Sequence, residues 1–155
     1  MGESMVMMFQ GAYVQAGPHT AVIGALKVLL QAGSTEARRE AISALEDQMA
    51  KFPQVEQPLS HHFIPGLYQR EIFNPKGCLI VTKRHKEANF SHILRGRLLV
   101  ITDEGQRELV APASFPTYPG TKRVLYSLED TIFTTTHPNP SNCEDIDQLE
   151  NRFAE

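Results

Sequence analysis

Cysteine and tryptophan are scarce in this 155-residue sequence, which has two cysteines and no tryptophan. Cys78 and Cys143 lie far apart and form no C-x-x-C pair, which excludes a thiolate metal knuckle and argues against a disulfide scaffold. No long apolar run is present either, because Gly24 and Lys27 interrupt residues 21–30, a stretch too short to span a bilayer. Since no signal-peptide pattern appears, we expect a cytoplasmic protein without a membrane partner.

An excess of charge of either sign is also lacking. The formal net charge is -3 and the sequence pI is about 6.1, which leaves no electrostatic footprint for a phosphate backbone. We therefore expect no direct nucleic-acid partner. No P-loop and no dinucleotide-binding glycine pattern appears. Hydrophobic residues make up 41% of the chain, which indicates one globular domain and not a disordered chain.

Up to about residue 60, apolar residues recur at helical spacing. One helix is predicted over residues 20–32, with Thr20 as its N-cap. A second helix is predicted over residues 34–51, with Ser34 or Thr35 as its N-cap. This part of the chain is therefore expected to be helical.

After residue 60, short alternating runs are separated by turn residues at intervals of roughly 8–12 positions. They predict about seven or eight strands within residues 67–137, the pattern of a small sandwich or barrel. The pair His61 and His62 is expected to precede the first strand. Neighbours on a strand point to opposite faces, so we expect no joint role for this pair.

A Ser141-x-x-Glu144 capping box predicts a short final helix. Ile146, Leu149 and Phe153 are expected to form its apolar face. The expected layout is an N-terminal arm (1–19), a helical segment (20–59), a β-barrel (60–140) and a C-terminal helix (141–155), within one domain.

Residues 77–96 have the spacing of a metal-binding loop, G-x5-H-x-H-x(3,4)-E-x6-G, with Gly77 and Gly96 at its ends. Lys83 stands at the first His position, His85 at the second and Asn89 at the Glu position. The spacing is therefore retained, whereas two of the three ligand types are not.

A second motif, G-x5-P-x-G-x2-H-x3-N, aligns with the YPGTKR segment. Gly120 matches the motif glycine, and Arg123 falls where the last His is expected. Tyr118, Pro112 and Ser127 replace the proline, the opening glycine and the Asn. The fourth ligand position is therefore also changed.

The two motifs together resemble those of the cupin superfamily. Residues 52–137 further resemble a small cupin-like (RmlC-type) family of tailed bacteriophages, through RHKEANFSHILRGRLLVITDEG, VAPASFPTYPGTKRVLY and EDTIFTTTHP. The resemblance implies a mainly β fold, a double-stranded β-helix or jelly-roll barrel, with N-terminal helices and a short C-terminal helix. It also implies a phage setting, in the host cytoplasm or in the virion.

A cupin metal needs three imidazoles and a carboxylate as lone-pair donors. Lys83 and Arg123 instead donate protons and are cationic. We therefore expect no metal cofactor. A rebuilt metal site from His85 and His137 is the alternative.

A structural or interaction role is the first functional hypothesis. The resemblance favours a virion-associated or assembly component that forms homo-oligomers and contacts other phage proteins. The Met-rich start MVMMFQGAYV, residues 5–14, is interpreted as a docking arm, since Met and aromatic side chains suit adaptable contact surfaces.

A small anionic ligand is the second hypothesis. Lys83, His85, Asn89 and Arg123 would form a pocket for a phosphate, nucleotide or sugar phosphate, as in a phage accessory or counter-defence factor. Alternatively, the two cations pair with carboxylates and seal the barrel, the candidates being Glu71, Glu87 and Asp103. A third hypothesis is a cupin-type isomerase or epimerase with His85 as its base. We favour a non-enzymatic role.

Overall fold

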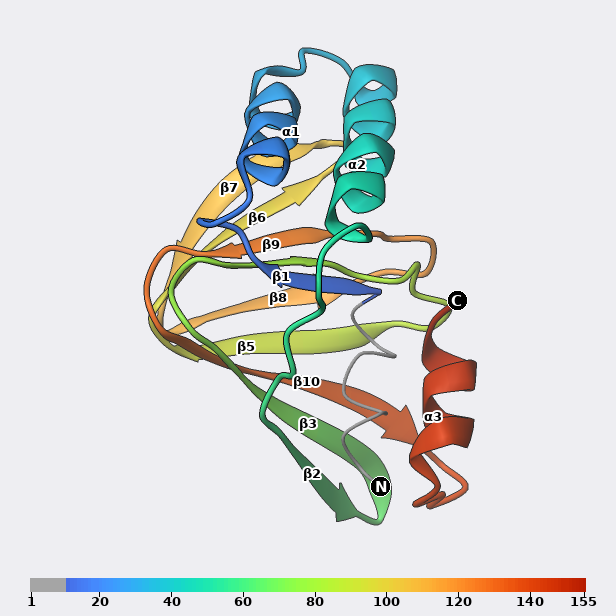
Figure 1. Cartoon of the computed structure of the whole chain (residues 1–155). Coiled ribbons are helices and arrows are strands. Elements are labelled where there is room, and N and C mark those ends of the chain that lie inside the picture. The colour runs from blue at the N-terminus through green and yellow to red at the C-terminus, as the bar shows by residue number, and fades with distance from the viewer. Residues whose placement is uncertain (1–10) are drawn as a thin grey trace.

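Two five-stranded antiparallel sheets face each other in residues 11–155, the part of the chain that the computed structural model describes (Figure 1). Their strand orders are β1-β4-β9-β6-β7 and β2-β3-β10-β5-β8. The mainly β class, with two N-terminal helices and a short C-terminal helix, is confirmed. The strands are β1 (Ala12–Gln15), β2 (Leu59–Ile64), β3 (Gly66–Asn74), β4 (Cys78–Val81), β5 (Asn89–Arg95), β6 (Arg97–Thr102), β7 (Gly105–Val110), β8 (Ala113–Thr117), β9 (Val124–Ser127) and β10 (Thr131–Asn139), and the helices are α1 (Thr20–Gln31), α2 (Thr35–Met49) and α3 (Ile146–Phe153).

Two of these strands were not predicted. Strand β1 lies within the segment expected to be an arm and pairs with β4, Tyr13 opposite Ile80. The expectation that His61 and His62 precede the first strand is wrong, because both lie on β2. Both strands are at sheet edges, and β2 has little apolar alternation, so periodicity alone does not reveal them. Residues 5–10 of the proposed docking arm lie outside the described residues.

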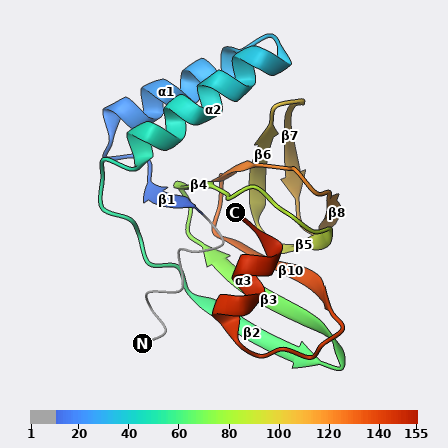
Figure 2. The same ribbon diagram turned by 90° about the vertical axis from the view of Figure 1, so that its right-hand side faces the viewer.

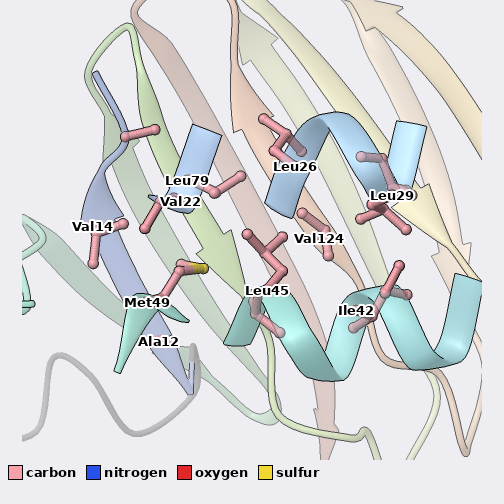
Figure 3. Packing of buried hydrophobic residues seen from close by; sticks show 14 residues of the cluster. Ala12, Val14, Val22, Leu26, Leu29, Ile42, Leu45, Met49, Leu79 and Val124 are labelled. Atoms are coloured by element: carbon pink, nitrogen blue, oxygen red, sulfur yellow. The ribbon is translucent and has the colours of Figure 1, made fainter. Parts of the chain in front are cut away.

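Helices α1 and α2 cover the outer face of the sheet β1-β4-β9-β6-β7 (Figures 1 and 3). Strand β4 is buried at all four positions because it faces the helices on one side and the other sheet on the other. Leu45 and Met49 of α2 are fully buried beneath α1 and the sheet. Burying side chains of this size stabilises the fold by about 1.5–3 kcal/mol each, which holds the helical pair on the barrel.

The helix caps differ in part from the prediction. Ser34 caps α2, as predicted, with its hydroxyl accepting from the Ala37 amide at 3.1 Å. The N-cap of α1 is His19 and not Thr20, and its side chain makes no capping bond. The prediction of a Ser141-x-x-Glu144 capping box is wrong, because Asp145 caps α3, its side chain accepting a hydrogen bond from the Gln148 amide at 3.2 Å.

The space between the two sheets is apolar at one end and polar at the other. Along β3, the inward positions run from Ile72 to Arg70 to Tyr68, with side chains alternating across the sheet. Opposite them on β10 lie Phe133, Thr135 and His137. We call the buried group Tyr68, Arg70, Asn89, Ser91, Thr135 and His137 the interior polar cluster.

Helix α3 packs over this polar end (Figure 2). Leu149 and Phe153 are buried against Tyr68, with Ile146 partly buried beside them, so the predicted apolar face is confirmed. Within residues 11–155, no helix is long and apolar enough to cross a membrane.

Candidate functional site

The interior polar cluster concentrates positive charge inside the barrel. Arg70 is only 4% exposed, and burial lowers its pKa to about 10, partly opposed by Tyr68 and Glu150. Burial also raises the pKa of the Tyr68 hydroxyl to about 12, and that hydroxyl lies 2.7 Å from Nδ1 of His61. The cluster therefore holds one guanidinium, that of Arg70, in surroundings with low access to water.

His85 and Asn89 meet next to this cluster. The Asn89 Nδ2 lies 3.4 Å from Nδ1 of His85, a long hydrogen bond. Burial lowers the pKa of His85 to about 4, with further lowering by the charges of Arg123 and then Arg70. His85 is therefore neutral at physiological pH.

His137 lies deeper in the same region. Its Nε2 lies 3.0 Å from the Thr135 hydroxyl, and its ring stacks on Phe153 with 4.2 Å between centroids. Burial lowers the pKa of His137 well below its ordinary value, helped by Arg70, His85 and Arg152. Both histidines of the alternative metal site are thus kept neutral, mainly by burial and further by nearby positive charge.

Arg123 directly precedes β9 in the chain, and its side chain forms hydrogen bonds with β8. Its Nη1 donates to the Thr117 hydroxyl, its Nη2 donates to the Pro116 carbonyl at 3.0 Å, and its guanidinium lies 4.7 Å from the centre of the Phe115 ring. Burial lowers the pKa of Arg123 to about 10, followed by repulsion from Arg107. The Nε atom is buried and makes no hydrogen bond.

Of the four predicted pocket residues, His85 and Asn89 lie together, and the charge of Arg123 acts on His85. Lys83 is half-buried and acts electrostatically on Glu150 of α3. The four-residue pocket stays a prediction. Of the carboxylates considered as counter-ions, Asp103 pairs with Arg39 at 2.7 Å, Glu87 pairs with Arg152 at 3.5 Å and Glu71 lines a depression on the outer face of the second sheet.

The donors present do not suit a transition metal. Among residues 11–155, no group of three or more His, Cys, Asp or Glu side chains comes close enough to hold an ion. The charges that lower the pKa of His85 and His137 would also repel a divalent cation. We therefore derive no metal chemistry for this barrel.

A cleft that sequence reasoning missed lies between α2 and the barrel. It has a volume of about 990 Å³ and is bounded by α2, the β6–β7 turn, β8 and the loop 118–123. Two ion pairs connect its helical wall to the barrel, Arg39 with Asp103 at 2.7 Å and Lys122 with Glu46 at 2.6 Å. The cleft depends on how the helices pack on the sheet, which no local motif encodes.

Three further arginines, Arg84, Arg107 and Arg123, line this cleft, which we call the arginine cleft. None of the three forms an ion pair within residues 11–155. Arg84 donates to the Gly120 carbonyl at 2.7 Å, a neutral partner, and Arg107 is exposed. The cleft lining therefore carries five cationic side chains, these three with Arg39 and Lys122, against the two carboxylates of Asp103 and Glu104.

Comparison with known proteins reveals the fold but no close relative. No family model matches, and no curated protein matches. Salicylate 1,2-dioxygenase from Pseudoaminobacter salicylatoxidans superposes with a TM-score of 0.51 at 10% identity, over 63% of this chain and 27% of the enzyme. A Cupin 2 conserved barrel domain protein from Salinispora arenicola gives 0.48 at 12% identity, over 62% of this chain and 84% of that protein.

The fold is a cupin-like jelly-roll barrel. A cupin-2 domain protein from Shewanella frigidimarina gives a TM-score of 0.44 at 11% identity, over 60% of this chain and 90% of that one. Identities this low concern the fold alone, because one fold hosts many functions. The function has to be argued from the residues of this barrel.

The C-terminal segment closes the polar end and buries a carboxyl group. Ala154 forms a β-bridge with His85, and the Lys86 amide donates to the Phe153 carbonyl at 2.7 Å. Glu150 is 4% exposed, and neither carboxyl oxygen has a hydrogen-bond partner. Burial raises the pKa of Glu150 to about 7, although Arg70 and Lys83 oppose the shift.

We predict that Glu150→Gln changes the pH dependence of stability. Because folding raises the pKa of Glu150, stability is lost as the pH rises from 4.5 through about 7. The variant should resemble the wild type near pH 4 and exceed it by about 2–3 kcal/mol near pH 8, measured by urea denaturation. The exposed Glu144→Gln is the control. A difference that stays constant between the two pH values would contradict this assignment.

Proposed function

We propose that this chain is a metal-independent cupin-fold protein that binds a small anion in the arginine cleft. The observation that carries the proposal is the set of three arginines, Arg84, Arg107 and Arg123, around a cleft of about 990 Å³ without carboxylate partners. The proposal retains Arg123 from the predicted pocket. It adds Arg84 and Arg107 from the structure.

The repulsion between Arg107 and Arg123 is the physical reason for an anion. Burial is the main cause of the lowered pKa of Arg123, and the charge of Arg107 lowers it further, because like charges near each other cost free energy. An anion between the two guanidinium groups would offset that cost. Guanidinium groups also match phosphate and carboxylate oxygens in geometry.

Side-chain contacts hold both walls of the cleft, α2 and the barrel, in place. The pairs Arg39–Asp103 and Lys122–Glu46 join α2 to the barrel, and Arg123 is held over Phe115. A site whose walls are already positioned loses less conformational entropy on binding. This supports a binding role.

Catalysis has less support than binding. A general base works best when its pKa lies near the working pH. The pKa of His85 is about 4, and its Nδ1 faces Asn89. We therefore do not propose an isomerase or epimerase.

The anion proposal is tested by calorimetry and thermal shift with pyrophosphate. We expect saturable binding that weakens at least about 10-fold in Arg107→Ala and in Arg123→Ala, because each variant loses a charge-assisted hydrogen bond. Arg95→Ala removes an equal charge at an exposed site outside the cleft and should change affinity by less than about 2-fold. Equal weakening in all three variants, or no binding by the wild type, would refute the proposal.

A second candidate is self-association through the outer face of the sheet β2-β3-β10-β5-β8. Helices α1 and α2 cover the other sheet and leave this face to solvent (Figure 1). Phe90 and Leu94 of β5 are 56% and 55% exposed, and such apolar groups on a sheet mark interaction sites. The proposed role in a phage particle or its assembly rests on the sequence resemblance and on this face.

We predict that the double variant Phe90→Lys and Leu94→Lys shifts the protein from dimer to monomer in sedimentation equilibrium. Two charges buried in an apolar contact would oppose association. Val28→Lys is the control, because Val28 is equally exposed but lies on α1. A wild type that is monomeric at high concentration would exclude this candidate and leave the anion proposal unaffected.

A further inference from the structure

The size of the arginine cleft indicates a ligand larger than a single phosphate. Its volume of about 990 Å³ lies at the upper end of the range typical for clefts that bind drug-sized molecules. The lining also includes apolar groups, Ile42, Val100 and Phe115 among them. Charge alone therefore does not describe the ligand, which needs an apolar or planar part as well.

An aromatic side chain supplies a surface for that part. Tyr118 lines the cleft and is 65% exposed, so its ring is available to a planar group. Its loop is tied down, because the Gly120 amide donates to the His85 carbonyl at 2.7 Å and the Thr121 amide donates to the Tyr118 carbonyl at 3.2 Å. The ring is thus presented from a backbone held by hydrogen bonds.

The same loop is connected to the positive charge. Arg84 donates to the Gly120 carbonyl at 2.7 Å, which joins one of the three arginines to the loop that carries Tyr118. Hydroxyl groups of Ser43 and Thr121 line the cleft as well. A ligand with phosphates, hydroxyls and a planar ring would use all three kinds of group.

We infer that the ligand of the arginine cleft is a nucleotide, with its phosphates on Arg84, Arg107 and Arg123 and its base stacked on Tyr118. This inference rests on the proposed anion site and names its ligand class. Tyr118 is then a specificity residue, because every base offers a ring face but an inorganic phosphate does not.

The test is calorimetric titration of the full chain with pyrophosphate, ribose 5-phosphate and the four common ribonucleoside diphosphates. At least one nucleoside diphosphate should bind about 10-fold or more tightly than pyrophosphate, the gain expected from one stacked base. Tyr118→Ala should abolish that gain and leave pyrophosphate affinity unchanged. Val28→Ala, which shortens a similarly exposed apolar side chain on α1 outside the cleft, should alter neither.

The possible failures are distinguishable. If pyrophosphate binds as tightly as every nucleotide, or if Tyr118→Ala leaves the nucleotide gain intact, the nucleotide inference is overturned while the anion site stands. If neither pyrophosphate nor any nucleotide binds, the anion site falls as well. A single-stranded oligonucleotide that binds more tightly than the best nucleoside diphosphate would also overturn the inference, in favour of a nucleic acid.

Discussion

The rest of the site depends on the contacts made by the guanidinium group of Arg123. Its side chain is bonded to Thr117 and to the Pro116 carbonyl of one sheet, while its backbone amide donates to the Thr82 hydroxyl beside the other at 2.9 Å. The same charge lowers the pKa of His85 and faces the arginine cleft. One side chain thus connects the two sheets, disfavours a cation inside the barrel and is central to the proposed anion site outside it.

The residues that the fold requires in this molecule are different from those that would set the chemistry of a metal site. Gly96 has a φ of +93°, and a Cβ there would overlap the Asp130 carbonyl oxygen, so the turn between β5 and β6 requires glycine for steric reasons alone. That requirement holds with or without a metal. The ligand positions carry no such backbone constraint, which is consistent with Lys83, Asn89 and Arg123 occupying them in this jelly-roll barrel.

The sequence predicted the parts that depend on local spacing. The motif glycines, the alternating strands after residue 66 and the Ser34 cap all act over a few residues. The arginine cleft was missed because Arg84 follows the end of β4, where alternation stops, and because Arg107 and α2 come to line one cleft only through tertiary packing. Glu150 was missed for a similar reason, since a carboxylate on a short amphipathic helix is normally exposed and this one is buried.

Anomalous diffraction from crystals grown with selenate, collected above the selenium edge, tests the central claim most directly. Selenate mimics a phosphate in charge and shape, and first-row transition metals also scatter anomalously at that energy. The account predicts a selenium peak bounded by Arg84, Arg107 and Arg123, with at least one selenate oxygen within hydrogen-bonding distance of the Arg123 guanidinium. A cleft without a peak, together with a metal peak between His85 and His137, would contradict it.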